Sequence, residues 1–281
     1  MRVKLSALLA LLAAAASAAG PEIDRARKLY NSTDFDGSLR LLSAMPAKDG
    51  AVYELIGRNY YMQREFKKAT EALEKAMAAE PGNSGYALWL GRAFGRRAET
   101  SSPFTAPGYA SKTRQYFEKA VQLDPRNLDA LTDLFEYYLE APGFLGGGLD
   151  KAAATASRIA QVDAAEGHTA QAKLAEKKKE YGAAEQFFRR AVESAPHPAG
   201  RLVDLARFLI RRGRDREAEQ TFAKADAIAP NNPKLLYERA EAYIRNGRNP
   251  ELARELLQRY LNSTLTADDP PRSDAAKLLQ H

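Results

Sequence analysis

The chain has 281 residues, of which 45% are hydrophobic and 28% are charged, so it can bury a core and is not disordered by composition. It contains no cysteine, which excludes disulfides and argues against a lipid anchor carried on cysteine. The net charge of +6 is too mild to indicate a nucleic-acid partner. Alanine, leucine and aromatic residues dominate the apolar positions, and this favours helices over sheets.

The first twenty residues differ from the remainder of the chain. Arg2 and Lys4 precede a largely apolar run from Leu5 to Ala16, and small residues follow it. This order predicts a secretory signal peptide over residues 1–19, and the run is too short to span a bilayer comfortably. Together with the absence of cysteine, it predicts a periplasmic or secreted bacterial protein with no membrane span.

After this segment, one spacing of small residues is repeated along the chain. Four markers follow one another at intervals of 12, 7 and 5 residues, and the last two copies are 34 residues apart at every marker. The three copies are Gly57, Ala69, Ala76 and Pro81; Ala172, Ala184, Ala191 and Pro196; and Ala206, Ala218, Ala225 and Pro230. The spacing predicts pairs of amphipathic helices that approach closely at the small residues, with a proline ending the second helix.

The best-defined copy also has aromatic and leucine-type residues at fixed places between these markers. Its pattern is Tyr53, Ile56, Gly57, Tyr60, Ala69, Leu73, Ala76 and Pro81. This pattern resembles the tetratricopeptide repeat (TPR), whose marks are an aromatic, Leu-Gly, Tyr, then spaced Ala, aromatic, Ala and Pro. The resemblance implies an all-α, TPR-type α-solenoid, in which helix-turn-helix repeats stack as a right-handed superhelix.

We expect about seven such hairpins in one domain over residues 20–265. Their approximate ranges are 22–46, 50–83, 84–127, 128–164, 165–198, 199–232 and 233–265. The third has ten extra residues in its turn, and the fourth has five. Residues 266–281 predict a C-terminal capping helix, which begins at Ser273 or Asp274 and covers the last hairpin.

The five extra residues of the fourth repeat lie in "APGFLGGGLDKA", residues 141–152. Gly143 and Gly148 have the spacing of a phosphate-binding loop, but Leu149 and Asp150 replace the Lys and Ser or Thr that such a loop requires. A helical pattern precedes the loop, whereas a phosphate-binding loop follows a strand. We therefore interpret it as a bend, with Pro142 ending one helix and Asp150 capping the next.

The ten extra residues of the third repeat lie within 97–111 and include Phe104 and Tyr109, with Trp89 on the preceding helix. Long turns of repeat arrays often carry function, so we predict a contact surface made of Trp89, Phe104, Tyr109 and Phe144. In the alternative, Phe104 and Tyr109 fold back onto Trp89 and the glycine loop. The turns 97–111 and 141–150 occupy equivalent places in adjacent repeats, so we expect them to be close in space.

A row of charged residues follows the small residue of each first helix. Its members are Arg27, Arg58, Arg92, Glu136, Lys173, Arg207 and Glu241. The resemblance implies that first helices line a concave groove, and five basic members favour an acidic or carboxylate-bearing peptide. The candidate partner-binding residues are thus Arg27, Arg58, Tyr61, Arg92, Lys173 and Arg207; the alternative is a solvated helix face interrupted by two glutamates.

The pattern gives catalysis little support. His168, His197 and His281 are scattered, and no cofactor or metal motif is present. The sequence predicts a non-catalytic, exported TPR scaffold that binds a protein or peptide, and self-association stays open. An alternative is a periplasmic solute-handling or transport-accessory protein, with a ligand pocket beside the loops of repeats three and four.

Overall fold

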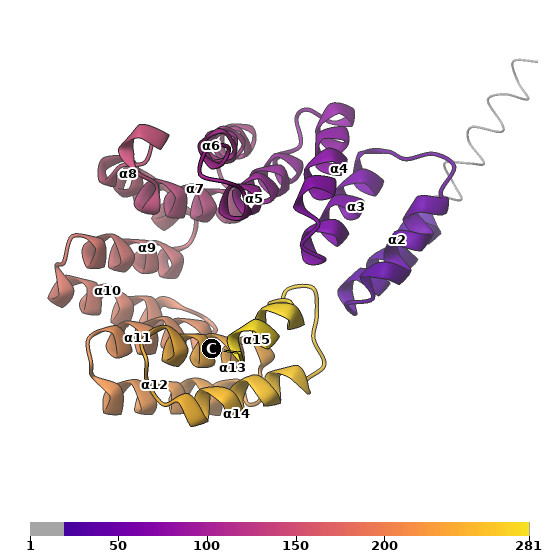
Figure 1. Cartoon of the computed structure of the whole chain (residues 1–281). Helices are drawn as coiled ribbons and strands as arrows, with labels where there is room; N and C mark the ends of the chain where they lie inside the picture. The colour runs from indigo at the N-terminus through magenta and orange to yellow at the C-terminus, as the bar shows by residue number, and fades with distance from the viewer. Residues whose placement is uncertain (1–19, 281) are drawn as a thin grey trace, which may run out of the picture. The chain divides into compact units, whose positions relative to one another are not determined.

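The structure is a computed structural model that describes residues 20–280. The predicted signal peptide, residues 1–19, lies outside the described residues. Every regular element within 20–280 is a helix, and the helices are arranged in successive antiparallel pairs (Figure 1). The predicted all-α repeat fold is therefore confirmed. None of the described helices is long and apolar enough to cross a membrane.

The chain divides into two compact units, Met1–Asp124 and Pro125–His281, where the sequence predicted a single continuous array. The boundary falls at Pro125, just after the second helix of the third repeat. Each unit is built from whole helix pairs, so the division leaves the repeats intact.

Over residues 20–124, the first unit contains three helix pairs. Residues 20–31 are helical and precede α2 (Phe35–Ala44). The other two pairs are α3 (Gly50–Met62) with α4 (Phe66–Ala79), and α5 (Ser84–Thr100) with α6 (Ala106–Leu123).

The second unit contains four pairs and a final helix. The pairs are α7 (Leu128–Glu140) with α8 (Leu149–Val162), α9 (Ala164–Lys177) with α10 (Tyr181–Ser194), α11 (Ala199–Arg211) with α12 (Asp215–Ile228), and α13 (Pro233–Arg245) with α14 (Pro250–Leu261). A 3₁₀ turn, η1 (Gly143–Leu145), lies between α7 and α8. The final helix, α15 (Arg272–Leu278), contacts α13 and α14, as expected for a cap.

The first helices of most repeats begin in the same way. The side chain of an Asp or Asn accepts a hydrogen bond from the backbone N–H three residues later, at Asp49, Asn83, Asn127, Asp163 and Asn232. Such a cap satisfies an N–H that has no partner inside the helix and is typically worth about 1 kcal/mol. These residues therefore fix where α3, α5, α7, α9 and α13 begin.

The small residues of the repeated spacing lie where the helices of a pair meet. The marker alanines, including Ala69, Ala184 and Ala218, are fully buried. A Cβ atom at Gly57 would come within 2.5 Å of Leu73 Cγ, so the contact of α3 with α4 has no room for a larger residue. The close approach predicted from the spacing is confirmed.

Two predicted helix caps are wrong. Helix α8 begins directly after Gly148, whose carbonyl accepts the first helical bond from Ala152 N, so Asp150 lies inside the first turn. Helix α15 begins at Arg272, one residue before Ser273, because the carbonyl of Pro271 already accepts from Asp274 N. In both cases a backbone carbonyl starts the helix and no side chain caps it.

Candidate functional site

Arginine and aromatic side chains stack alternately on the first helices of the N-terminal unit. The Arg58 guanidinium lies 4.9 Å from the ring centre of Tyr30 and 4.5 Å from that of Trp89. Arg92 lies 5.0 Å from the Trp89 ring, and Tyr61 meets Trp89 edge-on at 5.5 Å. We call Tyr30, Arg58, Tyr61, Trp89 and Arg92 the arginine–aromatic cluster. It comes from the helix at 20–31, α3 and α5.

One carboxylate, Glu54, accompanies this cluster. Its Oε1 lies 3.3 Å from Arg58 Nη1, one turn along α3. Burial raises the pKa of Glu54, although Arg58 and Arg27 act against the rise. Burial by itself would lower the pKa of Arg58, but Tyr30 and Glu54 raise it overall. Arg58 is therefore a firmly charged, partly buried donor.

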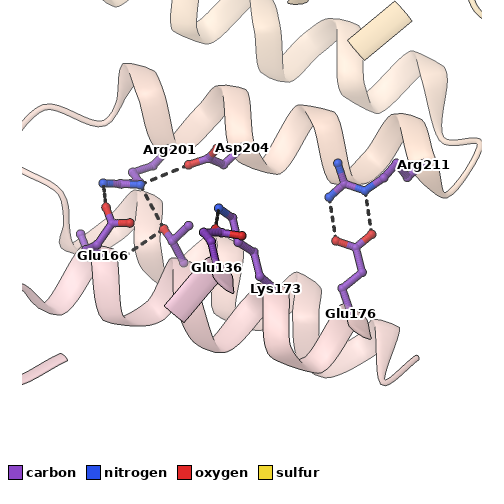
Figure 2. A network of polar contacts seen from close by, with 9 residues as sticks. Glu136, Glu166, Lys173, Glu176, Arg201, Asp204 and Arg211 are labelled. Carbon is purple, nitrogen blue, oxygen red and sulfur yellow. Dashed lines mark hydrogen bonds and ion pairs between the residues drawn. The ribbon is translucent and has the colours of Figure 1, made fainter. Parts of the chain in front are cut away.

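The predicted row behaves differently in the second unit. Lys173 forms an ion pair with Glu136, and Arg207 pairs with Glu241 at 3.4 Å. The row's two glutamates thus neutralise its two cations there (Figure 2 shows Glu136 and Lys173). The pairs join neighbouring first helices, so equivalent row positions do lie side by side within this unit.

Further ion pairs join the same first helices. Arg201 of α11 pairs with Glu166 of α9 and also with Asp204, 3.2 Å away (Figure 2). Arg211 holds Glu176 through two hydrogen bonds of 2.7 Å each. With the row pairs, they form an inter-repeat ion-pair ladder on α7, α9, α11 and α13. Its row cations Lys173 and Arg207 pair with glutamates of the row itself, whereas Arg58 of the N-terminal cluster pairs with Glu54, which lies outside the row.

Glu238 of α13 stands apart from this ladder, because no ion pair or hydrogen bond of its side chain is found within residues 20–280. Burial and the nearby Asp204 of α11 raise its pKa, and Glu241 adds to the rise; Lys234 and Arg207 act against it. The ionised carboxylate is consequently the unfavourable form in the folded protein.

Replacing Glu238 by Gln is expected to stabilise the protein at pH 7. A carboxyl with a raised pKa binds its proton more tightly in the folded state, so stability falls as pH rises above 4.5, the ordinary value. The amide does not titrate, so the advantage of E238Q should vanish below pH 4.5. Urea unfolding at pH 4 and pH 7 measures this, with the exposed Glu255→Gln as control; a gain that is equal at both pH values would contradict the assignment.

The prediction of a ten-residue insertion in the turn of the third repeat is wrong, because α5 extends to Thr100 and α6 begins at Ala106, which leaves a turn of residues 101–105. The aromatic residues of this region follow neither expectation completely. Tyr109 is packed, since its ring lies 4.1 Å from the Arg97 guanidinium, its hydroxyl accepts from Arg97 Nη2 at 2.5 Å, and it stacks on Phe94. Phe104 does not fold back: it is 95% exposed. Phe144 of the glycine loop is 82% exposed. The proximity of the two loops stays a prediction, because they belong to different units.

Backbone N–H groups of the glycine loop are hydrogen-bonded to carbonyls of the protein itself. The N–H groups of Leu145, Gly146 and Gly147 donate to backbone carbonyls of the same bend, and that of Gly148 donates to a carbonyl of α7. Lys151 Nζ donates to Gly146 O at 2.9 Å. A phosphate cradle needs such N–H groups free to point at the ligand. The bend interpretation is therefore supported by the hydrogen bonds, with Gly146 at φ 89° making the turn that glycine favours.

Residues 20–280 contain no group of three or more His, Asp or Glu side chains placed to hold a metal ion.

These features define the class: an α-solenoid of paired helices, with charged and aromatic side chains on its first helices. Residues 175–229 match the family model of the tetratricopeptide repeat. Residues 175–229 thus contain the tetratricopeptide repeat that the resemblance predicted, and the paired helices of residues 20–280 have the fold of such repeat proteins. No curated protein matches it in sequence.

Two solved structures illustrate the likeness of fold. A tetratricopeptide repeat protein of Parabacteroides merdae is 14% identical, with a TM-score of 0.60 over 92% of this chain and 96% of that one. A thermophilic tetratricopeptide repeat protein of Thermus thermophilus is 18% identical, with a TM-score of 0.53 over 71% and 98%. At these identities the likeness shows the fold alone. The fold implies a scaffold with protein partners in general, and such repeats are generally non-catalytic.

Sequence reasoning missed two residues of the candidate site, Tyr30 and Glu54. Glu54 and Arg58 have the i, i+4 spacing of a helical ion pair, which was an available signal. Tyr30 had no comparable signal, because its contact with Arg58 joins two adjacent repeats and is not local in sequence.

Proposed function

We propose that this protein is an exported scaffold that binds an acidic segment of a protein partner on the first helices of its N-terminal unit. The observation behind the proposal is the difference between the two units. In the second unit the row cations Lys173 and Arg207 pair with glutamates of the row. The row of the first unit contains only arginines, Arg27, Arg58 and Arg92, and the carboxylates paired with Arg27 and Arg58 lie one turn away on their own helices.

The arginine–aromatic cluster suits a carboxylate followed by a large apolar side chain. Two rings restrict the plane of the Arg58 guanidinium, so its donors lose little freedom when they grip a carboxylate. Trp89 and Tyr61 provide aromatic surface for a neighbouring phenylalanine or leucine of the partner.

The chain's single tryptophan, Trp89, allows a direct test. We expect an acetylated twelve-residue peptide with aspartates around one phenylalanine to change Trp89 fluorescence saturably. The same peptide with lysines in place of aspartates should not. Replacing Arg58 and Arg92 by Gln should weaken binding about tenfold or more, since each removes a charge-assisted hydrogen bond.

Lys173→Gln with Arg207→Gln is the matched control, because it removes two row cations from the other unit. If the change at Arg58 disturbs the fold, the single variant Arg92→Gln still tests the cluster. Circular dichroism checks that each variant is folded. Equal weakening by the control pair, or equal binding of the lysine peptide, would contradict the proposal.

The proposed compartment depends on residues 1–19 and is tested separately. The protein recovered from a periplasmic fraction should begin at Ala19 or Gly20. A cytoplasmic protein that retains Met1 would overturn export and leave the peptide-binding proposal standing.

A further inference from the structure

A cavity of about 210 Å³ lies under the C-terminal cap, between α13, α14 and α15. Ile244 of α13 and Leu257 of α14 line it, together with Leu278 and Leu279 at the end of the chain's last helix. Neither the sequence patterns nor the proposed peptide surface accounts for it. It also differs from the predicted ligand pocket beside the loops of repeats three and four, since it belongs to the last repeat.

The size of the cavity limits what it can hold. An apolar cavity of about 150 Å³ accommodates benzene. This one is therefore large enough for one aromatic ring with a short substituent, or for a short aliphatic chain. Its apolar walls favour such a body over a polar one.

Among residues 20–280, the charged residues of the lining are both arginines, Arg248 and Arg254, and no carboxylate lines the cavity. Arg248 Nε lies 3.5 Å from Asp215 Oδ2, so one carboxylate partly occupies it. Arg254 is exposed and has no ion pair or side-chain hydrogen bond within residues 20–280. Positive charge beside an apolar cavity selects an anionic head group on an apolar body.

The wall made by α15 is held in place at its other end. The Arg272 guanidinium donates to the carbonyls of Leu261 and Ser263, the latter at 2.8 Å, and the Tyr260 hydroxyl donates to Pro270 O. Ala275 is fully buried against the last hairpin. The cavity is therefore a built part of the capped repeat.

We propose that this cavity is a binding site for a small monocarboxylate with an apolar body, such as an arylalkanoate. The body fills the space against Ile244, Leu257 and Leu278, and the carboxylate meets Arg254 and Arg248. The site goes beyond the peptide-binding function, because it gives the last repeat a small-molecule ligand of its own.

The probe is 4-phenylbutyrate, titrated into the full chain by calorimetry. We expect saturable binding with one site, and 4-phenylbutanol and 4-phenylbutylamine should bind at least about tenfold more weakly, because they lack the anion. The double variant Arg254→Gln with Arg248→Gln should bind 4-phenylbutyrate more weakly by a similar factor. Ile244→Trp should abolish binding by filling the cavity.

The control is Arg259→Gln, also on α14 but outside the lining, and it should leave affinity unchanged. If the variants unfold, the proposal is still tested by comparing the affinities of the unchanged chain for the acid, the alcohol and the amine. Equal binding of the alcohol, equal weakening by R259Q, or no saturable binding of the acid would overturn the proposal.

Discussion

Replacing Gly167 by alanine is expected to destabilise the second unit by about 3 kcal/mol, the upper end of what overpacking costs. A Cβ atom at this position would lie 2.4 Å from Ala160 Cα and 2.5 Å from Ala160 Cβ. The obstacle is backbone of α8, so it cannot swing aside as a long side chain would. Helices α8 and α9 would have to separate, and this would open the contact between the fourth and fifth repeats.

Gly182 of α10 provides the matched control, because a Cβ there meets nothing within 4 Å. Alanine is the better helix former by about 1 kcal/mol, so Gly182→Ala should be neutral or stabilising. Urea unfolding followed by circular dichroism compares the two variants. Changes of the same sign and size would show that helix propensity, and not close packing, decides at Gly167.

Replacing Gly147 by alanine is the second change with a large expected effect, a loss of about 2 kcal/mol. The added Cβ would lie 1.8 Å from Ala141 O, so the glycine loop would have to open. Opening it would also break the bond from Gly147 N to Pro142 O, which measures 3.3 Å. The glycine is thus required by the bend itself.

Gly143→Ala is the control within the same loop, since a Cβ at Gly143 meets nothing within 4 Å. Thermal unfolding and limited proteolysis across 141–150 give the readout. We expect faster cleavage and a lower Tm for G147A alone. Unchanged stability of G147A would mean that the loop tolerates a side chain and that its glycines serve some other purpose.

The sequence predicted the fold well because the contact between paired helices is local and repeated. Small residues such as Ala69 and Ala184 are needed wherever two helices touch, so their spacing records the geometry directly. No comparable spacing in the sequence predicted the division into two units, because that division depends on packing between repeats.

The partner-binding role of the row stays a prediction. Within the second unit, row members of adjacent repeats do meet, and the presence of Glu136 in the same row as Lys173 was an available sign of neutralisation. Whether a charge is paired depends on side-chain geometry, which spacing does not give. The terminal cavity depends on where α15 settles over Ile244 and Leu257, and no pattern in the sequence encodes that distance.

The inter-repeat ion-pair ladder has a consequence for how the second unit comes apart. Each of its cross-repeat links, such as Glu166 with Arg201, reaches only the adjacent repeat. Stability along such an array behaves like a chain of nearest-neighbour couplings, in which loss of order starts at an open end and advances one repeat at a time. Arg272 holds α15 over the last hairpin and so covers the C-terminal end of the array. We therefore expect loss of order in the second unit to start away from that end.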